Sequence, residues 1–147
     1  MKIAIIGTGN VAKNLGKALS KKHEVVFGSR NPEMAKVDIN AKVTNIEDAA
    51  AQGDIIILAI PYKASDEILQ KIKDKARNKV VIDVMNALDE NFEWAKGFNE
   101  SVAEEVAKKL ENTKVVKAFN TVFAENMSKG KIGREKLTLL VAGDDEE

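Results

Sequence analysis

Two glycines and a small residue follow the first apolar stretch of the chain at a spacing that suits the binding of a pyrophosphate. The segment 3–6 is apolar, and Gly7, Gly9 and Ala12 come after it. In this pattern the first glycine allows a tight turn, the second lets the backbone approach a pyrophosphate, and the small third residue lets a helix pack closely on the strand. The backbone N–H groups at the start of that helix, near Asn10, would face the phosphates. The spacing therefore indicates a dinucleotide site.

The end of the second apolar stretch indicates which dinucleotide would fit. In an NAD site an acidic residue about 20 positions past the glycines binds the ribose hydroxyls. Here the segment 24–27 is followed by Gly28, Ser29 and Arg30, and the carboxylate of Glu24 lies at the wrong end of the segment. A hydroxyl and a guanidinium suit a 2′-phosphate, and charge-assisted hydrogen bonds of about 1.5–3 kcal/mol would favour NADP roughly ten- to a hundred-fold. The sequence thus predicts NADP; the alternative is that Arg30 is an ordinary solvated charge in a turn.

Apolar stretches alternate with helical patterns along the whole chain, and their order predicts the fold. We expect strands at 3–6, 24–27, 41–44, 54–61, 79–83, 113–118 and 137–142, and helices at 10–19, 33–36, 46–51, 65–75, 101–110 and 124–127. The run 54–61 is almost continuously apolar, which is typical of a central strand covered on both faces. The alternation predicts an α/β, Rossmann-type, doubly wound and mainly parallel sheet with helices on both faces.

Three predicted helices begin near residues of the types that cap a helix N-terminus. Asn31 precedes a proline, Ser65 precedes an apolar helical face, and Ser101 lies three residues before Glu104. The last pair has the spacing of a capping box, and a proline is favoured at the first helical position. We therefore expect all three residues to cap helices.

Ligands of such sheets bind across the carboxyl ends of the strands, where the strand order reverses. The predicted strand ends are Gly7 to Asn10, Gly28 to Arg30, Ala59 to Pro61, Val84 to Asn86 and Phe119 to Thr121. We expect these segments to line one crevice. Within it, Asn86, Asn120 and Thr121 either contact a ligand or satisfy local backbone groups, as such residues do in turns.

The composition limits the partners that the chain can have. The 147 residues include 23 lysines and arginines and 23 aspartates and glutamates, so the formal net charge is zero. This balance argues against nucleic acid, which normally needs a basic surplus on one face. The lack of cysteine excludes a disulfide framework and cysteine nucleophiles, and no apolar run approaches the ~20 residues of a membrane helix. We expect a single cytoplasmic domain, residues 1–147, with no membrane partner.

With these motifs the chain resembles the family of NADP oxidoreductases that use the 8-hydroxy-5-deazaflavin coenzyme, coenzyme F-420. The resemblance covers nearly all of the chain and rests on the order and spacing of its segments. They are Gly7-Thr8-Gly9-Asn10, Gly28-Ser29-Arg30-Asn31-Pro32, Ile60-Pro61, Val81 to Asn86, Ser101 to Glu105, Val115 to Thr121 and Val141 to Asp145. The family implies hydride transfer between NADP(H) and the deazaflavin, or a flavin-like acceptor. This transfer needs two closely stacked rings, so we expect neither a catalytic triad nor a metal.

The resemblance also implies roles for individual residues. The pyrophosphate would bind at Gly7, Thr8, Gly9, Asn10 and Val11, and the 2′-phosphate at Ser29 and Arg30. The nicotinamide ribose would lie beside the backbone of Ala59, Ile60 and Pro61, and the nicotinamide or its partner ring near Asn86, Asn120 and Thr121. Members of the family normally continue past the Gly-Asp-Asp segment. We therefore expect the domain to lack the usual C-terminal segment, which helps to close the deazaflavin cleft.

Two other functions stay open. The chain could be the N-terminal domain of an imine or ketone reductase, as in the pyrroline-5-carboxylate reductases, although the helical dimerisation domain of such enzymes is not in the sequence. It could also be a non-catalytic NADP-binding redox module. Phe92, Trp94 and Phe98 lie in one loop and either stack on a flavin-like ring or anchor the loop. Exposed sheet edges near the C-terminus would suit a homodimer.

Overall fold

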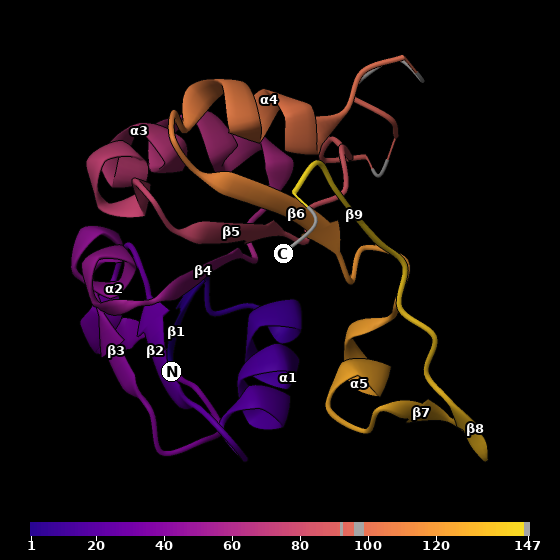
Figure 1. The fold of residues 1–147 in the computed structure, drawn as a ribbon. Helices are drawn as coiled ribbons and strands as arrows, with labels where there is room; N and C mark the ends of the chain where they lie inside the picture. The colour runs from indigo at the N-terminus through magenta and orange to yellow at the C-terminus, as the bar shows by residue number, and fades with distance from the viewer. Residues whose placement is uncertain (92, 96–98, 146–147) are drawn as a thin grey trace.

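A mainly parallel sheet forms the centre of the fold, which is described by a computed structural model for residues 1–91, 93–95 and 99–145 (Figure 1). The strands are β1 (Lys2–Ile6), β2 (Glu24–Gly28), β3 (Lys42–Thr44), β4 (Ile55–Leu58), β5 (Val80–Asp83), β6 (Lys114–Ala118), β7 (Lys131–Ile132), β8 (Glu135–Lys136) and β9 (Val141–Gly143). The α-helices are α1 (Asn10–Leu19), α2 (Ile46–Gln52), α3 (Ser65–Ala76), α4 (Val102–Lys109) and α5 (Ala124–Met127). Two short 3-10 helices are η1 (Pro32–Met34) and η2 (Tyr62–Ala64).

The larger sheet has the strand order β3-β2-β1-β4-β5-β6-β9. Its first six strands pair in parallel, and β9 pairs antiparallel with β6. The order reverses between β1 and β4, as in a Rossmann fold. This confirms the predicted fold class and the central position of β4. The last predicted strand, 137–142, is wrong in its bounds, since β9 spans only Val141–Gly143.

The strand register aligns the carboxyl ends of the parallel strands in one row. Ile6 lies opposite both Gly28 and Leu58. Leu58 in turn lies opposite Asp83, and Asp83 lies opposite Lys117. The segments that follow these residues therefore leave the sheet at the same edge, as the crevice prediction requires.

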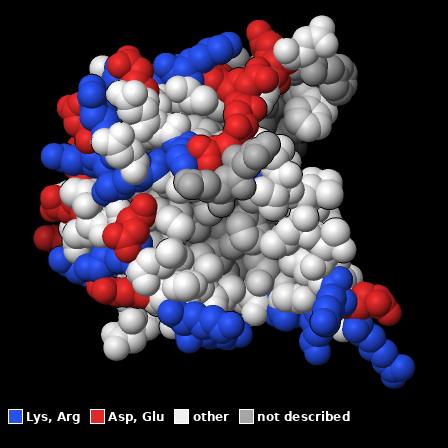
Figure 2. All heavy atoms as spheres, viewed as in Figure 1, with Lys and Arg blue, Asp and Glu red and all other residues white. Residues whose placement is uncertain are grey.

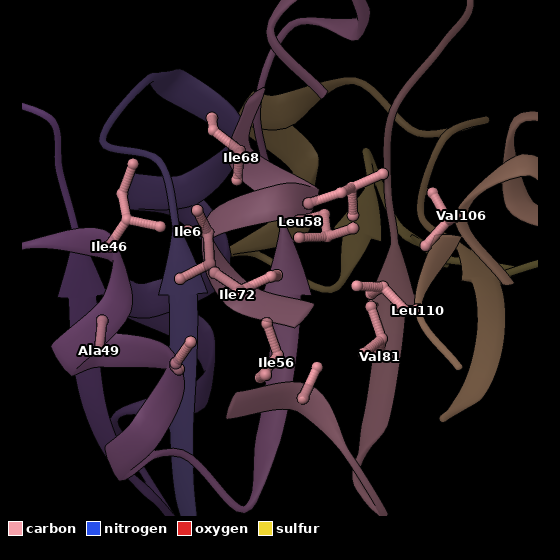
Figure 3. Close-up of a cluster of buried hydrophobic side chains, with 14 of the residues drawn as sticks. Ile6, Ile46, Ala49, Ile56, Leu58, Ile68, Ile72, Val81, Val106 and Leu110 are labelled. Atoms are coloured by element: carbon pink, nitrogen blue, oxygen red, sulfur yellow. The ribbon is translucent and has the colours of Figure 1, made fainter. Parts of the chain in front are cut away.

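Helices cover both faces of the sheet (Figure 1). One face packs against α2, α3 and α4, where apolar side chains such as Ile56, Ile72 and Val106 form a buried cluster (Figure 3). The other face packs against α1 and α5 through a second cluster that includes Phe27. There α1 sits very close to the sheet, because a Cβ added at Gly16 would lie 2.4 Å from Cζ of Phe27.

One of the three predicted helix caps, Ser65, is wrong, and a second is right in position only, because Asn31 is the N-cap residue before Pro32 without a side-chain hydrogen bond. The Asn31 side chain makes no capping hydrogen bond, and the segment after it forms only the 3-10 helix η1. Ser65 is buried and is the first residue of α3, not its cap. Because η2 runs directly into α3, this helix has no free N-terminus for a serine to cap. Ser101 does cap α4, accepting a hydrogen bond from the Glu104 N–H at 3.4 Å.

Charged side chains of both signs are interspersed over the left and upper parts of the face seen in Figure 2, whereas its middle is mostly uncharged. Basic side chains gather at the β7–β8 hairpin, where Lys131, Arg134 and Lys136 are exposed. The sequence did not predict this hairpin, whose strands have two residues each. None of the helices in the described part of the chain combines the length and apolar character that crossing a membrane requires.

Candidate functional site

The turn after β1 begins at Gly7, where only a glycine fits. Its φ is +120°, and a Cβ added there would lie 2.1 Å from the carbonyl oxygen of Ala59. On the other side, the Gly7 N–H donates a hydrogen bond to the Gly28 carbonyl at 2.9 Å. The ends of β2 and β4 therefore hold this turn from both sides.

Gly9 is the N-cap of α1 and faces open space. A Cβ added to Gly9 would have no atom within 4 Å, so the space above the turn is free for a ligand. No side chain caps this end of α1, and the first turn of the helix has no acidic residue. The N–H groups and the positive end of the helix dipole therefore favour an anion at this position. A pyrophosphate fits these features.

The turn after β2 presents a hydroxyl and a guanidinium. The Ser29 N–H donates to the Thr44 carbonyl at 2.9 Å, which joins this turn to β3. The Ser29 hydroxyl oxygen accepts a hydrogen bond from the Asn31 N–H at 3.1 Å. This leaves the hydroxyl proton for donation to a ligand. Arg30 is exposed beside it, so both groups can reach a phosphate.

A cavity of about 400 Å³ joins the turns after β1, β2 and β4. Eight of the predicted cofactor-binding residues line it: Gly7, Thr8, Gly9, Ser29, Arg30, Ala59, Ile60 and Pro61. Two others, Asn10 and Val11, are not in the lining; both belong to the first turn of α1, and Val11 packs against the apolar cluster on that face. The described residues of the lining include no aspartate or glutamate, so the lining carries no negative charge that would repel a phosphate.

Sequence reasoning missed the apolar wall of this cavity. It consists of Met34, Ala35, Ile46, Ala64 and Ile68. Met34, in η1, is 82% exposed. Its position four residues after Arg30 was the available signal, because the walls of small-molecule sites are mostly apolar. A planar base fits such a wall.

Asn86 and Asn120 come together at the ends of β5 and β6. The Asn86 side-chain amide donates to the Asn120 carbonyl at 3.1 Å, and the Asn120 side-chain amide donates to Oδ1 of Asn86 at 3.4 Å. Neither residue lines the cavity described above. Thr121 is exposed in the following turn and is not part of this pair. The structure thus brings together two of the three residues predicted to position a ring.

The backbone just before Asn120 adopts an uncommon conformation. Phe119 has a φ of +66°, in the left-handed region that bulky residues rarely adopt. Such conformations are concentrated at functional sites, where surrounding contacts maintain them. Of the three loop aromatics, Phe92 and Phe98 lie outside the described residues. Trp94 is 65% exposed, and its backbone forms an isolated β-bridge with Leu88.

Charges on α3 lie within the electrostatic field of Arg30. The hydrogen bond and attraction from Lys71 lower the pKa of Glu67, and Arg30 lowers the pKa slightly further. The same ion pair raises the pKa of Lys71, against a small opposing effect of Arg30. The cation at the end of β2 therefore interacts with a helix whose residue Ile68 lines the cavity.

Comparison with known proteins places this arrangement in a family. The family model described as "NADP oxidoreductase coenzyme F420-dependent" matches residues 2–87, which contain both the glycine turn and Arg30. The F420-dependent NADP reductase of Methanocaldococcus jannaschii is 30% identical, and the match covers 100% of this chain and 74% of that protein. The chain belongs to this family. The resemblance found in the sequence motifs is thus confirmed.

Other members of the coenzyme F-420 family agree with this placement. The F420-dependent NADP reductase of Methanothermobacter thermautotrophicus is 33% identical, over 84% of this chain and 62% of that protein. A crystal structure from an Arthrobacter species, of a candidate F420-dependent NADP reductase, superposes with a TM-score of 0.85 at 26% identity. It covers 99% of this chain and 75% of that one. The chain therefore spans 74% and 62% of the lengths of the two named reductases.

Proposed function

We propose that this chain is an NADP-dependent oxidoreductase that transfers a hydride between NADP(H) and the deazaflavin coenzyme F-420. The observation that carries the proposal is the cavity that joins the glycine turn to Ser29 and Arg30, in a chain that belongs to the coenzyme F-420 family. The cavity has open space at Gly9, an uncapped helix end and no lining carboxylate among the described residues. These features match the charge and shape of NADP.

The residues of the chain would act by binding and orientation. The turn after β1 and the start of α1, from Gly7 to Val11, hold the pyrophosphate through backbone N–H groups. The Ser29 hydroxyl donates a hydrogen bond to the 2′-phosphate, and the Arg30 guanidinium donates two more from its planar N–H groups. NADPH, when bound, supplies the hydride. Alignment of two rings contributes most of the catalysis in such a transfer, so no general acid or nucleophile is needed.

The nicotinamide end of the site is assigned to the ends of β4, β5 and β6. The backbone of Ala59, Ile60 and Pro61 would run beside the nicotinamide ribose. Asn86, Asn120 and Thr121 would position the nicotinamide or the deazaflavin. The mutual hydrogen bonds of Asn86 and Asn120 support this role, because they fix two amide groups at the edge where the parallel strands end.

The family supports this function over the two alternatives. An imine or ketone reductase and a non-catalytic redox module would each need the same dinucleotide cavity, so the cavity alone does not separate the three. No feature of the described site favours either alternative.

We also propose a domain organisation, a location and an oligomeric state for the chain. Residues 1–147 act as one NADP-binding domain, in the cytoplasm and as a homodimer. The homodimer is supported by exposed apolar side chains at the antiparallel edge strand β9: Val141, its first residue, is 66% exposed, and Leu140, the residue before it, is 64% exposed. Sedimentation velocity of the purified chain tests this part, and a monomer at micromolar concentration would contradict it.

An anaerobic absorbance assay tests the activity. The purified chain is mixed with NADPH and oxidised coenzyme F-420, and FMN and NADH serve as alternative acceptor and donor. We expect the deazaflavin absorbance to fall with NADPH and much more slowly with NADH. If NADPH binds in a parallel titration and neither acceptor is reduced, the proposed transfer to coenzyme F-420 is wrong, and the imine or ketone reductase and the redox module are the alternatives that stand.

A further inference from the structure

We propose that Asp83 and Lys117 are positioning residues that hold Asn86 and Asn120 in register with each other, and so orient the ring that reacts. The inference rests on the proposed function, since it assigns a role within the same site. The starting observation is that Asp83 is fully buried, at 0% exposure. The only other buried polar side chain in the described part of the chain is Ser65.

The two charged side chains are direct neighbours across the sheet. Asp83 is the last residue of β5, and Lys117 lies opposite it in β6. Nζ of Lys117 donates a hydrogen bond to Oδ2 of Asp83 at 2.9 Å. The Lys117 side chain is 22% exposed, so the ion pair is largely removed from water.

This ion pair binds the backbone that leads to Asn86. Nζ of Lys117 also donates to the carbonyl oxygen of Met85. The Met85 N–H donates to Oδ1 of Asp83 at 2.8 Å. Both polar backbone groups of Met85 are therefore bound by the pair, and Met85 is the residue immediately before Asn86.

The asparagine pair closes a ring of contacts above the ion pair. Asn86 lies three positions after Asp83, beyond the end of β5, and Asn120 lies three positions after Lys117, beyond the end of β6. The ion pair joins the two strands near their carboxyl ends, and the amide hydrogen bonds join the segments that follow them. A shift of one strand end relative to the other would therefore distort both the ion pair and the amide hydrogen bonds. The ion pair therefore determines where the two amides lie.

Stability alone does not explain why charges occupy this place. Desolvation of a buried ion pair generally offsets its attraction, so an apolar pair of similar volume is about as stable or more stable. The surrounding strand positions are apolar, including Val81 in β5 and Val116 in β6. What an apolar pair could not do is bind the N–H and the carbonyl of Met85. This directional contact points to orientation as the role of the pair.

The test uses the double variant Asp83→Leu with Lys117→Met, which replaces the ion pair by apolar side chains of similar volume. Either single variant would leave a buried charge unpaired and could unfold the chain. The control is Lys73→Met with Glu111→Leu, which removes an exposed ion pair of 2.9 Å between α3 and the end of α4. For both we would measure thermal unfolding, NADPH affinity, kcat with coenzyme F-420, the stereospecificity of hydride transfer at nicotinamide C4, and the side-chain amide NMR signals of Asn86 and Asn120.

We expect the site variant to unfold cooperatively but at a temperature several degrees lower, because the buried N–H and carbonyl of Met85 lose their partners. It should bind NADPH with an affinity within about threefold of wild type. Its kcat should fall about tenfold or more, its stereospecificity should decrease, and the two amide signals should move toward the positions of solvated asparagines. The control should match wild type in every measurement. Unchanged kcat and amide signals in the site variant would overturn the inference. Loss of cooperative unfolding, or a fall in NADPH affinity as large as the fall in kcat, would also overturn it, because the role would then be structural.

The NMR measurement separates this inference from the proposed function. If the wild-type chain does not reduce coenzyme F-420, the proposed function fails. The amide signals of the double variant still show whether Asp83 and Lys117 fix the asparagine pair. Signals that stay at their wild-type positions would then overturn the inference without any turnover measurement.

Discussion

The two ends of the candidate site are built in different ways. At the cavity, shape is set by backbone contacts, because Gly7 lies between Ala59 and Gly28 with no room for a side chain. At the ends of β5 and β6, exposed amides are held by side-chain hydrogen bonds. A typical hydrogen bond contributes about 1 kcal/mol, whereas no rotamer change can relieve a clash with the backbone. Substitutions at the first end should therefore decide whether a dinucleotide binds, and substitutions at the second end how it is oriented.

The largest effect should come from the glycine turn. In Gly7→Ala the methyl group meets the Ala59 carbonyl, so the free energy of unfolding should fall by about 2 kcal/mol or more. NADPH binding should be lost as well. Gly9→Ala is the matched control, because its methyl group meets no atom of the chain. Its stability should change by less than about 1 kcal/mol, yet NADPH affinity should still fall. Urea unfolding and fluorescence titration check both, and normal NADPH affinity in Gly9→Ala would place the pyrophosphate elsewhere.

Removal of the Arg30 guanidinium should weaken the binding of NADPH and not that of NADH. Arg30→Ala should lower NADPH affinity roughly ten- to a hundred-fold, since charge-assisted hydrogen bonds are lost, and should leave NADH affinity nearly unchanged. Arg30→Lys should fall between the two, because it keeps the charge without the planar donor pair. Isothermal titration with both dinucleotides measures the ratio. Equal losses for NADPH and NADH would contradict a 2′-phosphate site.

The asparagine pair should affect turnover more than binding. Asn86→Ala and Asn120→Ala should each lower kcat about tenfold, equivalent to about 1.4 kcal/mol in the barrier. Asn86→Ala removes both hydrogen bonds, whereas Asn120→Ala removes only the one that its own side chain donates, so the double variant should lose little more than Asn86→Ala alone. Steady-state kinetics with coenzyme F-420 would measure this coupling. Fully additive losses would mean that the two amides act independently.

The smallest effect on NADPH affinity should come from a charge change on α3. Glu67→Gln removes a negative charge that interacts with Arg30, so NADPH affinity should rise about twofold at low ionic strength and return to the wild-type value at high salt. Glu111→Gln is a matched control, because Lys73 lowers the pKa of Glu111 in the same way and Arg30 is not among the causes. An equal change in both variants would show that the effect is not local to the cavity.

Local patterns predicted most of the fold and the turns that line the cavity, but not the side-chain contacts at the ends of β5 and β6. The glycine turn, the central strand β4 and the capped start of α4 follow from short-range periodicity and spacing, which the sequence displays directly. Ser65 was misassigned because its role depends on the preceding turn η2 continuing into the helix. The pair Asp83 and Lys117 could not be predicted, since the residues are 34 positions apart and meet only through strand register.

The contact of Gly16 with Phe27 has a consequence for how this sequence can diverge. A Cβ at position 16 would overlap the aromatic ring of Phe27. The helix α1 can therefore pack this close to the sheet only if position 16 is glycine or position 27 carries a smaller side chain. In relatives with the same distance between this helix and the sheet, a larger residue at position 16 should accompany a smaller one at position 27. The two positions are thus expected to covary, and an alanine at position 16 without such compensation should push the C-terminal half of α1 away from β2.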